Sequence, residues 1–267
     1  MKFLLTMAAL VAAASVHAAE RSGRASVELL VASATFQPAR PVETAIRLKA
    51  DPGWHTYWTN PGEGGMATAV TWKLPAGWSA GPLGWPVPVR FMTGELPGYG
   101  YPEEVLLPVT LTPPAGAAAD QPVSIEAKVE WLTCSDDACV PGEVVLKLEL
   151  KPGEASATPQ MGEVARANAA LPRAIDGLAL DVRDAGDRLA LTLKAPDGLD
   201  LSAAAVFPVT PRVVDPAAVI RFSRQDGKWT AMAPKSEYLT GAAGELELVL
   251  AGGDLSHPAR VAWAGKP

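Results

Sequence analysis

Apolar and polar residues alternate with a period of two along much of the first half of the chain. The alternation is clearest in residues 42–49, 123–131 and 143–150, where one set of positions is mostly apolar and the other mostly charged. A strand with one face in a core and the other in water has this pattern. Residues 26–34, 68–74 and 104–112 add further candidates. Short strands of this kind, separated by Pro and Gly turns, predict an antiparallel β-sandwich.

A break in the pattern divides the chain into two parts. Residues 151–160 (KPGEASATPQ) have the composition of a linker, and residues 161–171 are the one convincing helix candidate. Beyond Pro172 the strand pattern resumes at 178–183, 187–194, 204–209, 218–223, 228–233, 245–251 and 260–264. We therefore expect an all-β protein, with a first domain at 20–151, a linker and short helix at 152–171, and a second, smaller, sandwich-like domain at 172–267.

The first residues have the pattern of an export signal. Residues 1–19 (MKFLLTMAALVAAASVHAA) place one Lys before a short apolar run and end in small residues, which is typical of a cleavable signal peptide. The run is shorter than a bilayer requires, and no later segment is apolar enough to serve as a membrane span. The expected mature protein is periplasmic or otherwise exported, in a compartment where a disulfide can persist.

Composition and charge exclude several classes of protein. The net charge is −6, from 29 acidic and 23 basic residues, so the chain lacks the basic face that a nucleic-acid partner requires. No glycine-rich phosphate-binding loop occurs between a strand and a helix. Only two cysteines are present, too few for a disulfide-rich scaffold or a four-thiolate zinc site. We expect no bound cofactor.

The two cysteines, Cys134 and Cys139, stand where one alternating segment ends and the next begins. We expect the two segments to form a hairpin and the thiols to pair across its loop, provided that the α-carbons come within ~7 Å. Closing so short a loop contributes only about 2 kcal/mol in the chain-entropy account, so a redox role and a structural role both remain open. Asp136 and Asp137 lie between the sulfurs and favour the protonated thiol over the thiolate. The pair therefore suits a disulfide that a partner's thiolate attacks.

A wider pattern resembles one protein family. The segments WHTYWTNPGEGG (54–65), WPVPVRF (85–91), GYGYPEEVLLPVTL (98–111) and VEWLTCSDDACVPGE (129–143) resemble the N-terminal periplasmic domain of the DsbD thiol:disulfide interchange proteins, in the branch of the ScsB-like suppressors of copper sensitivity. The resemblance covers roughly residues 25–150. It implies an immunoglobulin-like sandwich whose cysteine pair receives electrons and passes them to periplasmic partners, with links to cytochrome c biogenesis and copper tolerance.

The resemblance also assigns roles to residues. Cys134 and Cys139 match the redox pair, and Tyr57 matches an aromatic position near it. Phe91 is the candidate for the aromatic cap that covers the disulfide until a partner displaces it, with Tyr99 or Tyr101 as alternatives. We expect residues 91–101 to form a loop, which Gly94, Gly98 and Gly100 would make mobile enough to open when a partner docks.

The expected partner is a thioredoxin-like periplasmic protein or a membrane thiol-reductase domain. This follows because the chain shows neither the membrane domain nor the CxxC thioredoxin-like domain of full-length family members. The direction of electron transfer stays open. A non-catalytic binding or assembly protein with a structural disulfide is the main alternative.

Other chemistry finds less support in the sequence. His55 and His257 are the only histidines beyond the signal segment, and no nucleophile elbow accompanies them, so we interpret His55 as packed or solvent-facing. A copper(I) site could combine the two cysteines with Met66 or Met92, which suits ligand softness, but no pattern fixes these groups together. We therefore assign no metal site. The tryptophans are interpreted as core residues rather than as a sugar-binding platform.

Overall fold

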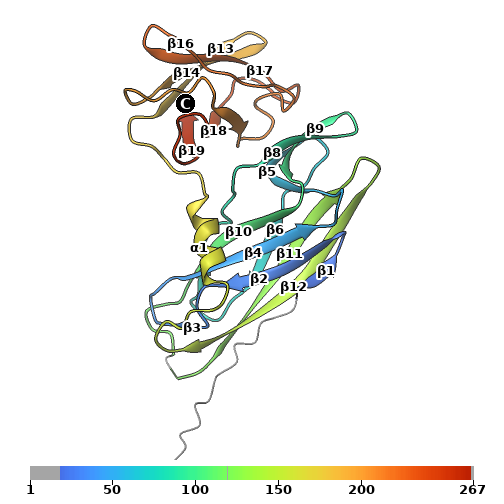
Figure 1. The fold of residues 1–267 in the computed structure, drawn as a ribbon, viewed down its shortest axis with the longest axis vertical. Coiled ribbons are helices and arrows are strands. Elements are labelled where there is room, and N and C mark those ends of the chain that lie inside the picture. The colour runs from blue at the N-terminus through green and yellow to red at the C-terminus, as the bar shows by residue number, and fades with distance from the viewer. Residues whose placement is uncertain (1–18, 119, 266–267) are drawn as a thin grey trace, which may run out of the picture.

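The structure, a computed structural model, describes residues 19–118 and 120–265. It is 52% strand and 4% helix, which confirms the all-β expectation (Figure 1). The expected signal peptide lies outside the described residues except for Ala19, and the domain limits set from the sequence stay predictions. Within the described ranges, no helix combines the length and the apolar character needed to cross a membrane.

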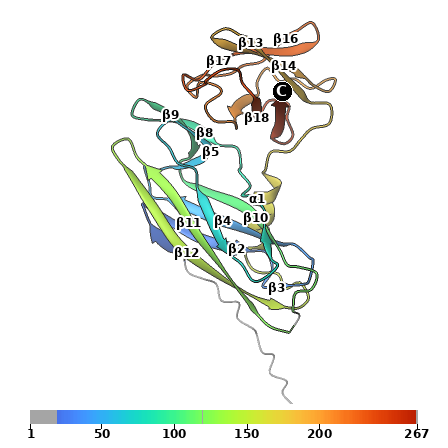
Figure 2. The same cartoon turned by 180° about the vertical axis from the view of Figure 1, so that it is seen from behind.

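The first twelve strands form what we call the N-terminal unit. They are β1 (Glu20–Ser22), β2 (Ala25–Val31), β3 (Thr35–Phe36), β4 (Val42–Ala50), β5 (Thr56–Gly62), β6 (Ala69–Lys73), β7 (Ser79–Ala80), β8 (Val89–Thr93), β9 (Leu96–Tyr101), β10 (Glu104–Thr112), β11 (Val123–Cys134) and β12 (Cys139–Pro152). One sheet has the order β1-β2-β4-β10-β7 and a second has the order β3-β12-β11-β6. Figure 2 shows the two sheets as layers of a sandwich.

The core of the sandwich uses the apolar positions of the alternating segments. Ile46 and Leu48 of β4 pack with Val129 and Trp131 of β11, and all four are completely buried. Their neighbours in sequence, such as Lys49 and Glu130, face outward in the manner expected of half-buried strands. The predicted β-sandwich is therefore confirmed.

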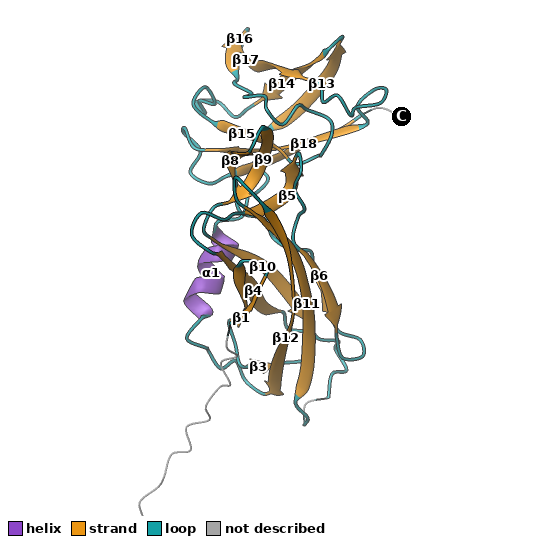
Figure 3. Ribbon diagram, turned by 90° about the vertical axis from the view of Figure 1, so that its right-hand side faces the viewer, coloured by secondary structure: helices purple, strands orange, loops and turns teal. Residues whose placement is uncertain are grey.

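A small third sheet, in the order β5-β9-β8, lies at one end of the sandwich and faces the C-terminal half of the chain (Figures 1 and 3). Strands β8 and β9 form a tight hairpin in which Thr93 pairs with Leu96 around a turn at Gly94, whose φ of 59° suits glycine. The interpretation of residues 91–101 as a mobile loop was therefore wrong in its secondary structure.

The remaining strands form the C-terminal unit. They are β13 (Ala179–Ala185), β14 (Arg188–Lys194), β15 (Ala205–Pro208), β16 (Ser223–Gln225), β17 (Lys228–Pro234), β18 (Glu245–Ala251) and β19 (Ala259–Ala264), in sheets of order β13-β14-β17-β16 and β15-β18-β19. The strand predicted at 218–223 is wrong, because only Ser223 at its end joins a ladder. The apolar alternation there instead reflects Ile220 and Phe222, which are buried as irregular chain in the core of the C-terminal unit.

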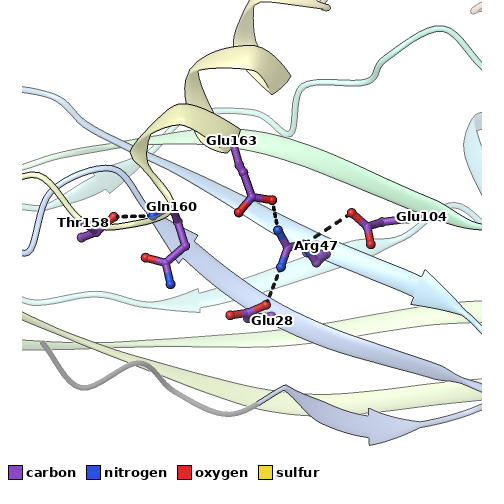
Figure 4. Close-up of polar contacts among 6 residues, drawn as sticks. All are labelled: Glu28, Arg47, Glu104, Thr158, Gln160 and Glu163. Atoms are coloured by element: carbon purple, nitrogen blue, oxygen red, sulfur yellow. Dashed lines mark hydrogen bonds and ion pairs between the residues drawn. The ribbon is translucent and has the colours of Figure 1, made fainter.

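Helix α1 (Met161–Ala169) joins the two units and packs on the outer face of the first sheet. It confirms the predicted helix, which ends two residues earlier than expected. Figure 4 shows how its first turn is fixed: the Arg47 guanidinium of β4 lies among three carboxylates. These are Glu163 of α1, Glu28 at 3.0 Å and Glu104 at 3.6 Å. Arg47 thus ties the helix to two neighbouring strands as well as to its own.

The two units also share apolar contacts. Phe207 of β15 and Val249 of β18 belong to the same buried cluster as the N-terminal core. The Phe207 ring lies 6.3 Å from Trp58 and 6.1 Å from Tyr99, centroid to centroid, in edge-on geometry. The packing therefore runs from one unit into the other next to the small sheet.

Candidate functional site

The cysteine pair closes the end of the β11–β12 hairpin. The two strands pair without interruption from Val123 opposite Leu150 to Cys134 opposite Cys139. The last pair is a disulfide whose α-carbons are 4.1 Å apart. Directly opposed residues on antiparallel strands project their side chains to the same side, so the ladder itself brings the two sulfurs together. The predicted hairpin and disulfide are both present.

The two halves of the disulfide have different surroundings. Cys134 is completely buried, whereas Cys139 is exposed. The backbone of Cys134 is also held on its other side, because its N–H donates to the His55 carbonyl (3.1 Å) and its carbonyl accepts from the His55 N–H (2.9 Å). The accessible half of the disulfide is therefore Cys139.

His55 is the residue that sequence reasoning undervalued. It pairs with Cys134 as an isolated antiparallel bridge, which places the imidazole and the Cys134 side chain on the same side of the backbone. The residue is 9% exposed, and its Nε2 lies 3.1 Å from Thr93 Oγ1 and 3.4 Å from the Tyr57 hydroxyl. Burial lowers the pKa of His55, and the negative charge of Asp136 partly opposes that shift.

Phe91 of β8 covers this group of side chains. Its ring centroid lies 4.0 Å from that of His55 and 5.6 Å from that of Tyr57. The ring rests on the glycines of β9: a Cβ added to Gly98 would come within 2.8 Å of the Phe91 ring, and one added to Gly100 within 3.0 Å. Gly98 therefore allows close approach of the aromatic ring, whereas Gly100 mainly allows close approach of the β5 backbone, because its added Cβ would lie 2.0 Å from the Thr56 carbonyl oxygen.

The two tyrosines of β9 face away from Phe91. Successive side chains of a strand point to opposite faces, so Tyr99 and Tyr101 lie on the face opposite to the one where Phe91 packs on Gly98 and Gly100. The Tyr99 hydroxyl donates to the Pro216 carbonyl (3.0 Å), and that of Tyr101 donates to the Pro86 carbonyl (2.8 Å). Neither takes part in the aromatic group around His55, which leaves Phe91 as the cap candidate.

The loop between the cysteines is short and polar. The Ser135 N–H donates to the Ala138 carbonyl (2.9 Å), and the Ser135 hydroxyl accepts from the N–H groups of Asp137 and Ala138. Asp136 and Asp137 are both exposed, and Asp136 lies near enough to His55 to act on its charge. The two carboxylates considered in the sequence analysis thus place negative charge in the exposed loop that leads to Cys139.

The methionines considered for copper are on the surface. Met66 is 43% exposed and Met92 is 53% exposed. Among the described residues no group of three or more His, Cys, Asp or Glu side chains is arranged to hold a metal ion. The geometry instead supports sulfur chemistry, because an exposed disulfide half beside a buried one offers a single sulfur for nucleophilic attack.

Two contributors to the site were missed in the sequence. His55 was interpreted only as a packed or solvent-facing residue, and Thr93, which bridges β8 to His55, was not considered. His55 contacts Cys134 and Thr93 contacts His55, and in each case the two residues are far apart in the chain. A local sequence pattern cannot predict such contacts. The one signal in the sequence was the position of His55 two residues before Tyr57, on the same strand face.

Comparison with known proteins agrees with this geometry. Residues 26–151 match the family model described as "Thiol:disulfide interchange protein DsbD, N-terminal". The crystal structure of the N-terminal periplasmic domain of ScsB from Proteus mirabilis shares the fold, with a TM-score of 0.68 at 20% sequence identity, over 90% of this chain and 93% of that chain. No curated protein sequence matches the chain. The structural likeness extends through both units.

Proposed function

Because residues 26–151 form a domain of the DsbD N-terminal family, which is a thiol:disulfide interchange domain, we propose that the chain is a periplasmic module that relays reducing equivalents. Its Cys134–Cys139 pair exchanges electrons with a thioredoxin-like protein or a membrane thiol-reductase domain. Two observations support the periplasmic setting: the structurally similar ScsB domain is a periplasmic one, and the N-terminus of this chain has the pattern of a signal peptide.

The relay consists of two exchange steps. A partner thiolate attacks Cys139 Sγ, the Cys134–Cys139 bond breaks, and Cys134 leaves as a thiolate that takes up a proton. The second thiol of the partner then loses its proton and attacks the partner sulfur of the mixed disulfide, which releases Cys139. Two electrons and two protons pass from the partner dithiol to the cysteine pair, and the reverse sequence oxidises the pair again.

The observation that carries this proposal is the asymmetry of the disulfide. Cys139 is exposed at the end of the hairpin, while Cys134 is buried and bonded through its backbone to His55. In-line attack requires access to one sulfur and a leaving group that departs away from the nucleophile. Only Cys139 offers that access.

Exposed apolar side chains near the disulfide support docking of a protein partner. Val89, Met92 and Leu96 of the β8–β9 hairpin and Met66 after β5 are each 43–53% exposed. Val89 and Leu96 lie on the same face of the hairpin as Phe91, because side chains alternate along β8 and Leu96 pairs with Thr93. Exposed apolar groups on one face of an element are a feature of interaction sites.

A purely structural disulfide explains less. The β11–β12 ladder joins twelve consecutive residue pairs, so the bond is one contact among many that hold the hairpin together. The loop that the bond closes is short, so its expected contribution is about 2 kcal/mol. A structural role also gives no reason for an aromatic group packed beside the pair.

Trapping of the mixed disulfide tests the relay. The variant Cys134→Ser leaves Cys139 as a single thiol, which runs the exchange in the reverse direction: its thiolate attacks the disulfide of an oxidised thioredoxin-like periplasmic protein and releases one partner thiol. Because Cys134 is absent, it cannot resolve the mixed disulfide, so the covalent complex should accumulate. Cys139→Ser should accumulate much less. The complexes are measured on non-reducing gels after acid quench and identified by mass spectrometry.

The outcomes separate the possibilities. Equal trapping by both variants would remove the preference for Cys139, and absence of trapping by either would count against the relay. The double variant Cys134→Ser/Cys139→Ser serves as the control for non-covalent carry-over.

A further inference from the structure

Arg90 connects the cap hairpin to the C-terminal unit. Its guanidinium donates to the Val206 carbonyl (2.8 Å) and to the Pro216 carbonyl (3.1 Å), both in the C-terminal unit. It also lies 4.9 Å from the Tyr99 ring centre and 5.5 Å from that of Phe207. A third hydrogen bond goes to the Tyr99 hydroxyl (3.3 Å), so Arg90 makes three hydrogen bonds and two cation–π contacts, and three of these five cross the junction.

Tyr99 repeats this connection from the neighbouring strand. It pairs with Arg90 across the β8–β9 ladder, and its hydroxyl donates to the same Pro216 carbonyl that accepts from Arg90. Tyr99 is completely buried. A third contact comes from β5, where the Asn60 side-chain amide donates to the Pro208 carbonyl (2.8 Å). All three strands of the small sheet are therefore bonded to the C-terminal unit.

The alternation of side chains makes this connection relevant to the disulfide. Arg90 and Phe91 are consecutive on β8, so they project to opposite faces of the hairpin. Arg90 points into the C-terminal unit, while Phe91 packs on His55 beside Cys134. A hairpin held on one face by the C-terminal unit can lift its other face only by breaking the Arg90 contacts or bending around them.

We infer that the C-terminal unit holds the cap closed: Arg90, assisted by Tyr99, is a positioning residue that keeps the β8–β9 hairpin, and with it Phe91, over the disulfide site. This inference rests on the proposed cap role of Phe91 and gives the C-terminal unit a part in the exchange reaction. A partner that contacts both units would release the hairpin as it docks.

The test measures the rate at which dithiothreitol reduces the Cys134–Cys139 disulfide in the full mature chain. Arg90→Met keeps the length and apolar stem of the side chain but removes its hydrogen bonds, and should raise the rate about tenfold, as loss of a charge-assisted hydrogen bond implies. Tyr99→Phe removes one hydroxyl from an otherwise unchanged buried ring and should raise the rate by a smaller factor.

The matched control is Tyr101→Phe. Tyr101 lies on the same strand and face as Tyr99, but its hydroxyl donates to the Pro86 carbonyl inside the N-terminal unit. Dithiothreitol should therefore reduce the disulfide of this variant at the same rate as that of the unaltered protein. Hydrogen exchange of residues 89–93 should quicken in Arg90→Met and Tyr99→Phe and stay unchanged in Tyr101→Phe.

A second arm shows whether Arg90 acts through Phe91. In the Phe91→Ala background the cap is already absent, so Arg90→Met should add no further acceleration, and the two effects should be strongly non-additive. An unchanged rate in Arg90→Met, or the same acceleration with and without Phe91, would overturn the inference. So would a Phe91→Ala rate equal to that of the unaltered protein.

The experiments distinguish a wrong role for Arg90 from a wrong proposal of the relay. The trapping experiment with Cys134→Ser reports the relay directly and does not require Arg90. Normal trapping together with an unaffected Arg90→Met rate would leave the relay standing and remove the role assigned to the C-terminal unit.

Discussion

At the scale of single residues, the Phe91 ring can take its position only because Gly98 has no side chain. A methyl group at Gly98 would lie 2.8 Å from the Phe91 ring, closer than carbon atoms can pack. Gly98→Ala should therefore displace the ring and speed reduction of the disulfide by small thiols several-fold. The same change at Gly116, which has no atom within 4 Å of the added carbon, is the matched control. Equal rates for the two variants would show that the ring does not shield the disulfide.

His55 gives the folded protein a dependence on pH. Burial lowers its pKa below the ordinary 6.5, so between the folded and unfolded pKa values the unfolded chain binds more protons than the folded one. The free energy of unfolding should therefore decrease as the pH falls below about 6.5, and this contribution should level off below the pKa of the folded state.

Chemical denaturation at a series of pH values from 7.5 downward measures this effect. His55→Gln should flatten the acid slope relative to that of the unaltered protein. Asp136→Asn should steepen the slope, because it removes the charge that raises the pKa of His55. A slope unchanged by His55→Gln would contradict the assignment.

At the scale of elements, the β11–β12 hairpin should survive without its disulfide. The ladder is continuous, and Trp131 and Val129 anchor it in the core. Cys134→Ala/Cys139→Ala should keep the far-ultraviolet circular dichroism of the unaltered protein while losing about 2 kcal/mol of unfolding free energy. A variant that fails to fold would favour the structural role.

The same elements show what a sequence can report. The pairing of β11 with β12 could be predicted, because both strands alternate over a long stretch and the connection between them is short. Strand β9 was hidden, because the segment GELPGYGY (94–101) has the Gly and Pro content of a loop. Gly98 makes room for the Phe91 ring and Gly100 for the β5 backbone, and both contacts arise from the pairing of β9 with its neighbouring strands.

The site residues also fall into those that local motifs predicted and those that they did not. The cysteines, Tyr57 and Phe91 were found through motifs within continuous segments. His55 and Arg90 were not, since their roles depend on a bridge to Cys134 and on carbonyls of the C-terminal unit. Side chains that act across long-range contacts leave no periodic signal.

At the scale of the whole molecule, Phe207 couples the two units. It belongs to the C-terminal unit but is buried among Trp58 and Tyr99 of the N-terminal one. Phe207→Ala should cost about 3–5 kcal/mol and separate thermal unfolding into two transitions. Phe222→Ala, which removes an equally buried ring from the core of the C-terminal unit alone, is the matched control. It should lower the stability of that unit without displacing the cap hairpin, and a single shared transition in Phe207→Ala would contradict the coupling.

The ladder that places Cys134 opposite Cys139 has a consequence for the lifetime of the covalent complex. Reduction breaks the sulfur–sulfur bond but leaves the strand pairing, so the two thiols stay on α-carbons 4.1 Å apart. The effective concentration of one thiol at the other is then far above that of any partner in solution. When the reduced pair donates electrons to an oxidised partner, we therefore expect Cys134 to release a partner joined to Cys139 quickly, so that the covalent intermediate of the proposed relay does not accumulate.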